Sequence, residues 1–70
     1  MKMKEVFSSN VNKVGYDEET KEFHVEWANG KRSIYSGVTP QQANGISTSW
    51  SVGGAIEEVL KKPNVPHRYG

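Results

Sequence analysis

Histidine and carboxylate side chains are the first candidates for chemistry in this sequence, because they can transfer protons or bind metal ions. The two histidines, His24 and His67, lie far apart in the chain, and no His-x-x-x-His or Glu-x-x-His spacing occurs. Cysteine is absent, which excludes thiolate ligands, a cysteine nucleophile and disulfides. No serine stands in a Gly-x-Ser-x-Gly context. The sequence therefore predicts no enzyme, no metal and no cofactor, unless folding assembles a ligand set.

Aromatic and basic side chains are the second group, and their chemistry suits nucleic-acid binding. Tyr35 and His24 are expected to be cross-strand neighbours on the solvent face of a sheet, where they could stack a base between them. The phosphate contacts would come from basic residues, namely Lys31, Arg32, Lys13 and Arg68. The plainer alternative for Tyr35 and His24 is an ordinary cross-strand pair.

Charge and hydropathy limit the class of protein. Nine Lys and Arg face eight Asp and Glu, so the formal charge is +1 and there is no overall basic excess. The N-terminal segment has no apolar stretch behind its lysines, and no run approaches the roughly 20 apolar residues of a membrane span. A soluble cytoplasmic protein without a membrane partner is expected.

Two turn signals divide the first half of the chain into three strands. Residues 17–21 are polar throughout, and Asn29-Gly30 is the pair that a two-residue type I′ hairpin prefers. The first strand is expected at about 11–16. In the second, apolar residues alternate with polar ones, and these are Phe23, Val25 and Trp27.

The turn type also predicts the pairing of the second and third strands. A two-residue loop pairs Trp27 with Arg32, Val25 with Ile34 and His24 with Tyr35. Ile34 then belongs to a core face with Val14, Tyr16, Phe23, Val25 and Trp27. Tyr35 lies on the opposite, solvent-facing side.

The periodicity of a helix begins after Val38. Thr39-Pro40 is an N-cap and N1 pair, and Ala43, Ile46 and Trp50 then fall on one helical face. Both tryptophans are in phase with the apolar residues of their own elements, so the core is expected to hold Trp27 and Trp50, although either could instead anchor an interface.

A second helix is expected from Ser51 to the residue before Pro63. Its apolar residues recur at helical spacing, at Val52, Ala55, Ile56, Val59 and Leu60. Glutamates at 57 and 58 precede lysines at 61 and 62 by one turn, the order that favours ion pairs. The segment 63–70, with His67, Arg68 and Tyr69, is either a flexible arm for RNA or a protein groove, or a segment packed on the domain.

Five segments, read in order, resemble the KTSC domain family. They are Ser8-Ser9-Asn10-Val11, Val14-Gly15-Tyr16-Asp17, Phe23-x-Val25-x-Trp27-x-Asn29-Gly30, Tyr35-Ser36-Gly37-Val38-Thr39-Pro40 and Ser51-Val52-Gly53. The family is named for a C-terminal segment of some lysyl-tRNA synthetases and also occurs as free-standing small proteins in bacteria and phages. RNA binding is its usual suggested role, so the resemblance implies a small RNA-binding domain.

Two positions depart from the family pattern. The Tyr-x-Tyr motif after the Asn-Gly turn is represented by Ser33 and Tyr35, and the Ala-x-Ser-x-Gly segment begins with Ser49. Two aromatic residues on one sheet face would form a stacking platform for bases, and one is half of it. The fold that the resemblance implies is unaffected, whereas the implied RNA binding is weakened.

The sequence as a whole predicts an α+β fold, a three-stranded antiparallel β-meander followed by two α-helices packed on one face. Residues 1–62 would form the domain and 63–70 a C-terminal tail. The predicted function is non-catalytic RNA binding through the uncovered sheet face. The alternative is a small regulator, bacterial or phage-encoded, that docks on a bacterial transcription or translation protein such as RNA polymerase, which the near-zero net charge and the missing tyrosine favour.

Overall fold

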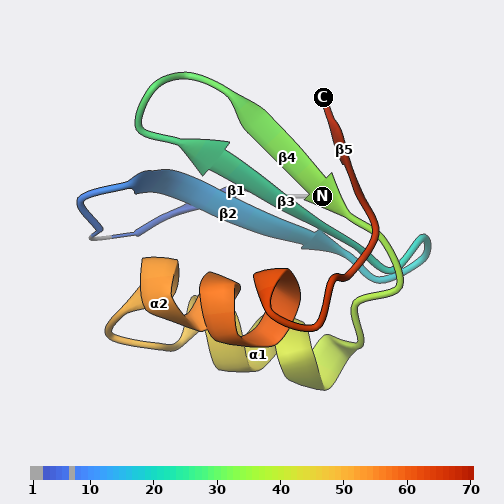
Figure 1. Ribbon diagram of the computed structural model, residues 1–70. Coiled ribbons are helices and arrows are strands. Elements are labelled where there is room, and N and C mark those ends of the chain that lie inside the picture. Colours follow the sequence, from blue (N-terminus) through green and yellow to red (C-terminus); the bar gives the residue numbers. More distant parts are fainter. Residues whose placement is uncertain (1–2, 7) are drawn as a thin grey trace.

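The chain folds into an antiparallel sheet with helices on one face, in a computed structural model that describes residues 3–6 and 8–70 (Figure 1). Five strands follow one another across the sheet in sequence order, β1 (Met3–Glu5), β2 (Val11–Asp17), β3 (Glu22–Trp27), β4 (Arg32–Tyr35) and β5 (His67–Tyr69). Between β4 and β5 lie helix α1 (Pro40–Ser47), helix α2 (Val52–Ile56) and the π-helix η1 (Glu57–Lys61). The predicted α+β class is confirmed, and the described sheet has five strands where three were predicted.

The two additional strands are the edges of the sheet. β1 and β5 have three residues each, too few to show the alternation by which a strand is recognised from sequence. β5 pairs antiparallel with β4. The segment 63–70 is therefore packed on the domain, the second of the two alternatives that the sequence left open.

Helix α1 begins as its sequence predicts. The Thr39 hydroxyl accepts a hydrogen bond from the Gln42 amide (3.2 Å), and the Gln42 side chain accepts one from the Thr39 amide (3.0 Å). This capping box satisfies two amide groups that the first turn leaves without helical partners. The helix ends at Ser47, so Trp50 lies in the connection to α2 and is 96% exposed. The prediction of a core Trp50 is wrong, because the helical spacing does not continue past the helix.

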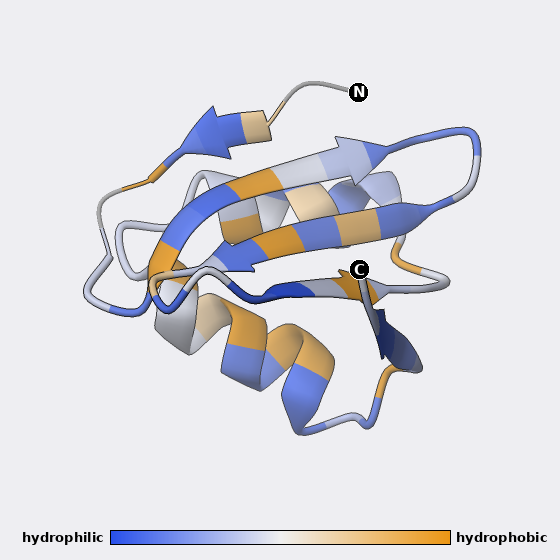
Figure 2. Ribbon diagram, turned by 90° about the horizontal axis from the view of Figure 1, so that it is seen from above, coloured by the Kyte–Doolittle hydropathy of each residue, from blue (hydrophilic) through white to orange (hydrophobic). Residues whose placement is uncertain are grey.

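The helix face of the sheet and the helices enclose the core. Its buried apolar residues are Val11, Val14, Phe23, Val25, Tyr35, Val38, Ala43, Ile46, Val52, Ile56 and Leu60. Along β3 the apolar residues alternate with polar ones (Figure 2), whereas in β2 a register shift between Val11 and Lys13 interrupts the alternation. The Tyr16 hydroxyl donates a hydrogen bond to the carbonyl oxygen of Val38, which holds the link between β4 and α1 against β2.

The hairpin between β3 and β4 has a three-residue loop, one residue longer than predicted. The Gly30 amide donates to the Trp27 carbonyl (2.9 Å), and the Trp27 amide donates to the Lys31 carbonyl (2.8 Å). Gly30 has a φ of 86°, but Asn29 is outside the positive-φ region that a type I′ turn requires at both central positions. Asn29-Gly30 is thus the end of a three-residue loop with glycine in the left-handed conformation.

The longer loop shifts the pairing by one residue. Glu26 lies opposite Arg32, Val25 opposite Ser33, His24 opposite Ile34 and Phe23 opposite Tyr35. Because side chains alternate between the faces of a sheet, this shift exchanges the two faces of β4. Tyr35 is 3% exposed on the core side, and Ile34 lies on the open face, the face of the sheet turned away from the helices. The predictions of a solvent-facing Tyr35 and a core Ile34 are therefore wrong.

The loop conformation predicts opposite effects for two glycine substitutions. Gly30→Ala should lower the free energy of unfolding by about 1 to 2 kcal/mol, because a β-carbon disfavours the left-handed conformation. Gly45→Ala should instead raise it by about 0.5 to 1 kcal/mol, since Gly45 lies inside α1. A β-carbon would meet no atom within 4 Å at either position, so steric contact does not complicate the comparison. Urea denaturation measures both effects, and a Gly30→Ala variant at least as stable as the parent would contradict the loop conformation.

Candidate functional site

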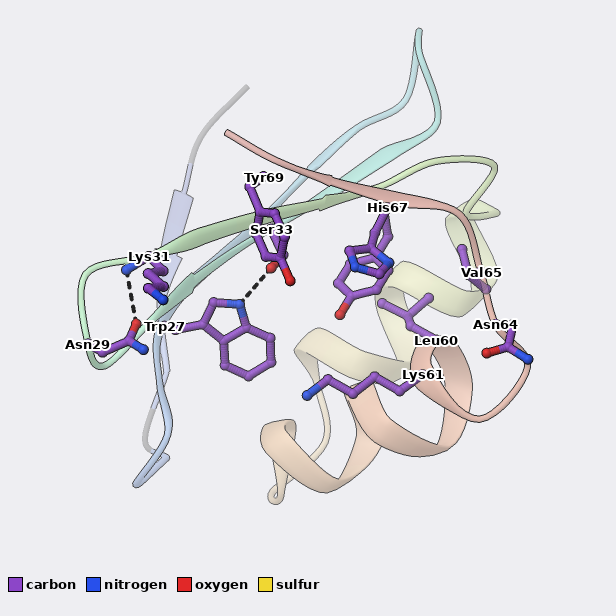
Figure 3. Close-up of a pocket in the computed structure, with 11 residues that line it drawn as sticks. Trp27, Asn29, Lys31, Ser33, Leu60, Lys61, Asn64, Val65, His67 and Tyr69 are labelled. Carbon is purple, nitrogen blue, oxygen red and sulfur yellow. Dashed lines mark hydrogen bonds between the residues drawn. The ribbon is translucent and has the colours of Figure 1, made fainter.

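A cleft of about 410 Å³ opens on the helix side of the sheet, where β4 and β5 pass the end of η1 (Figure 3). We call it the aromatic cleft, and its lining residues are Trp27, Asn29, Lys31, Ser33, Tyr35, Leu60, Lys61, Asn64, Val65, His67 and Tyr69. None of these residues is acidic, although acidic residues nearly equal basic ones in the whole chain. Two lysines give the cleft a positive charge.

Three aromatic rings of the cleft come from β4 and β5. Tyr35 lies opposite His67 and Ser33 lies opposite Tyr69, so period 2 brings both β5 rings to the helix side of the sheet. The His67 ring centre is 5.4 Å from that of Tyr35 and 5.7 Å from that of Tyr69. Burial raises the pKa of the Tyr35 phenol, and nearby Tyr69 adds to the shift. Tyr35 supports the group from the core, whereas Tyr69 is 76% exposed and presents its ring to solvent.

Trp27 and Lys61 form the other side of the aromatic cleft. The half-buried indole donates a hydrogen bond from Nε1 to the Ser33 hydroxyl (2.9 Å), and the Lys61 ammonium lies 4.6 Å from the centre of a Trp27 ring. In the view of Figure 3, Trp27 and His67 stand on opposite sides, and the Lys61 side chain extends toward the indole. Trp27 packs against the core as predicted, but it also lines the cleft.

The lysines at the end of the second helix behave differently from each other. Lys62 forms the predicted ion pair with Glu58 (2.8 Å), and this contact raises the pKa of Lys62. Lys61 was predicted to pair with Glu57 in the same way. Among the described residues Lys61 has no ion pair, and its ammonium lies over Trp27.

The open face of the sheet carries the other predicted phosphate contacts, and each stands beside a carboxylate. Arg32 pairs with Glu26 (3.2 Å), and Lys13 lies in register between Glu5 and Glu26. Because these basic side chains already face carboxylates, an incoming phosphate would have to compete with the carboxylates for them. The same carboxylates would also repel the phosphate.

Glu22 lies beside two more of the predicted site residues, His24 and Arg68. It lies 3.8 Å from His24 and 2.6 Å from Arg68. The hydrogen bond from the Arg68 guanidinium, which outweighs partial burial, lowers the pKa of the Glu22 carboxyl. This bridge joins β5 to β3 across β4, and it occupies Arg68 with a structural contact.

The structure thus separates the predicted site residues. Tyr35 and Lys31 line the aromatic cleft, whereas His24, Arg32, Lys13 and Arg68 belong to the opposite face. The predicted stack of Tyr35 on His24 does not form, because the two side chains are on different faces.

Sequence reasoning did not place Trp27, Lys61, His67 and Tyr69 in one site. The spacing of His67 and Tyr69, two rings two residues apart, is the signal that an edge strand would have explained. No local pattern indicates that Lys61 meets Trp27.

Metal-binding clusters and membrane-spanning helices are both absent from residues 3–6 and 8–70. No group of three His, Asp or Glu side chains there is arranged to hold a metal ion. In the same residues, no helix has the length and apolar character needed to span a bilayer.

Comparison with known proteins agrees with the fold. Residues 7–63 match the family model of the KTSC domain, which confirms the resemblance seen in the sequence. The crystal structure of a KTSC domain protein from Yersinia pestis is 20% identical and superposes with a TM-score of 0.90, over 99% of this chain and 96% of that chain. No curated protein gave a significant match.

Proposed function

Because this chain belongs to the KTSC domain family, we propose that it is a non-catalytic binding module and that it holds single-stranded RNA in the aromatic cleft. The observation that carries the proposal is the composition of the cleft. It combines four aromatic side chains with two lysines and contains no carboxylate. Proteins that bind single strands use this combination, with rings for the bases and cations for the phosphates.

Tyr69 is the ring most available to a base. Its side chain is exposed and stands at the mouth of the cleft, edge-on to His67 at an interplanar angle of 85°. Lys31 and Lys61 are both exposed and could reach the backbone of a bound strand. This arrangement moves the proposed interface from the open face, where the sequence suggested it, to the helix side of the sheet.

The family's Tyr-x-Tyr motif supports the same surface. Its two positions, Ser33 and Tyr35, both line the aromatic cleft. At the first position this chain has a hydroxyl that accepts a hydrogen bond from Trp27 in place of a second phenol. Trp27 therefore provides a ring beside the position where the family has a tyrosine.

The small net charge limits the expected strength of binding. With a formal charge of +1 and two lysines at the cleft, long-range attraction of a polyanion is weak. We therefore expect micromolar affinity at best. The proposed place of action is the cytoplasm, where single-stranded RNA is plentiful.

Titration of a labelled single-stranded RNA, followed by fluorescence anisotropy, tests the proposal. Tyr69→Ala should weaken binding by about 1 to 3 kcal/mol, the usual worth of one base stack, with little dependence on salt. Trp50→Ala is the matched control, because it removes an exposed aromatic side chain outside the cleft. Lys31→Gln should instead reduce the salt dependence by about 0.7 in slope, as expected for one phosphate contact.

Two results would contradict RNA binding at this cleft. One is the absence of saturation at high micromolar protein. The other is equal weakening by Tyr69→Ala and Trp50→Ala, which would place the contact elsewhere or make it nonspecific.

A second candidate is a regulator of bacterial or phage origin that docks on a protein of the transcription or translation machinery. Trp50 favours it, since a fully exposed tryptophan is typical of binding hot spots at protein interfaces. A pull-down from bacterial lysate separates the two candidates. A partner that is retained after ribonuclease treatment and lost with Trp50→Ala supports docking, whereas a ribonuclease-sensitive catch that depends on Tyr69 supports RNA binding.

A further inference from the structure

We propose that Lys61 covers the face of Trp27 in the free protein and yields it to a nucleobase, while the displaced ammonium binds the phosphate of the same nucleotide. This inference rests on the proposed function and makes the ligand of the cleft more specific. The ligand would be one unpaired nucleotide, recognised by its base and its phosphate together. A nucleoside without phosphate would also have to displace Lys61, but the displaced ammonium would gain no phosphate contact in return.

The indole is the fixed partner of this contact. Its Nε1 donates to the Ser33 hydroxyl at 2.9 Å, and Ser33 is only 4% exposed. Lys61 is the partner that can move, because it is exposed at the end of η1 and, among the described residues, its ammonium forms no ion pair and lies over the ring. At an exposed site a cation–π contact is weaker than a base–aromatic stack, so a base can take its place.

The surroundings leave room for the exchange. Trp27, Asn29 and Lys61 also line a neighbouring hollow of about 350 Å³, completed by Asn10 and Ala28. Lys61 thus lines both open spaces, so there is room beside its ammonium for the exchange.

The charges favour a phosphate as the new partner of the ammonium. No carboxylate lines the aromatic cleft or the neighbouring hollow. In the described chain Lys61 has no ion pair to break, whereas the next residue, Lys62, is held by Glu58 at 2.8 Å. In the free protein the Trp27 ring therefore holds the Lys61 ammonium beside the cleft, at the place where the nucleobase would stack.

The test compares one ligand with and without its phosphate. Trp50→Phe first makes Trp27 the only indole, which is a mild change because Trp50 is 96% exposed. Adenosine 5′-monophosphate and adenosine are then titrated into this protein and into its Lys61→Met form, with the Trp27 fluorescence and the indole NH resonance as readouts. NMR titration measures the weak binding expected of single nucleotides.

Lys61→Met should change the two affinities in opposite directions. Binding of the nucleotide should weaken about three- to tenfold, because a charged contact to phosphate is lost. Binding of adenosine should tighten about two- to fivefold, because the cation–π contact no longer has to be broken. Lys62→Met is the matched control and should leave both affinities within about twofold, since Lys62 lies outside the cleft.

The outcomes distinguish this inference from the proposed function. If Lys61→Met weakens both ligands equally, or changes neither, the exchange does not occur and RNA binding is untouched. If single nucleotides do not bind while a longer RNA does, recognition of one nucleotide is wrong. If neither binds the unmodified protein, the RNA proposal fails and this inference fails with it.

Discussion

Tyr35→Ala should destabilise the domain by about 3 to 5 kcal/mol, the cost of truncating a large buried aromatic side chain. Tyr35 is 3% exposed, lies opposite Phe23 and supports the His67 ring, so its removal leaves a cavity beneath the aromatic cleft. For a chain of this length the total stability is about 4 to 10 kcal/mol, so the variant should be near the limit of folding. Thermal or urea denaturation followed by circular dichroism measures the loss.

Ile34→Thr is the matched control for Tyr35→Ala. Ile34 is the adjacent residue on β4 and points to the open face, so a β-branched polar replacement should cost less than about 1 kcal/mol. If Ile34→Thr proved the more damaging change, the two-residue hairpin loop would be right and the observed register wrong. Loss of RNA binding in Tyr35→Ala would not identify a contact, because the variant is also destabilised. Tyr69 is exposed, so Tyr69→Ala tests the contact without this effect.

Val25→Asp should abolish cooperative folding at neutral pH. Val25 is fully buried at the centre of the sheet, between Val14 on β2 and Ser33 on β4. The buried cluster around it is apolar, so a carboxylate there would lose its hydration without gaining a charge partner, which costs several kcal/mol and is comparable with the total stability. The expected result is a circular dichroism signal without a melting transition.

Glu26→Gln controls for the effect of changing charge on the same strand. Glu26 is the next residue on β3, on the open face, and pairs with Arg32. Loss of this pair should cost less than about 1 kcal/mol. A folded Val25→Asp, or an unfolded Glu26→Gln, would contradict the assignment of the two faces of β3.

Local chemistry determined much of the fold. The alternation of Phe23, Val25 and Trp27 identified β3, and the Thr39-Pro40 pair identified the start of α1. Val52, Ile56 and Leu60 identified the face that the second helix buries. Each of these features depends on residues that are close together in the sequence, so the sequence alone is enough to predict it.

The register between β3 and β4 could not be predicted from local sequence. Asn29-Gly30 is compatible with a two-residue loop and with the end of a three-residue loop, and the two differ by one residue. The choice is made by packing, because the observed pairing brings Tyr35 into the core and leaves Ile34 outside. The side on which an RNA-binding surface was expected changed with it.

The aromatic cleft itself exists only in the tertiary structure. Trp27, Lys61 and Tyr69 come from a central strand, the end of a helix and an edge strand, and the segments between them are long. A three-residue strand such as β5 forms because β4 offers it a free edge, to which the bridge from Arg68 to Glu22 holds it. The types of the residues that could bind RNA were thus readable from the sequence, whereas their grouping required the folded chain, because contacts between distant segments leave no periodicity in either one.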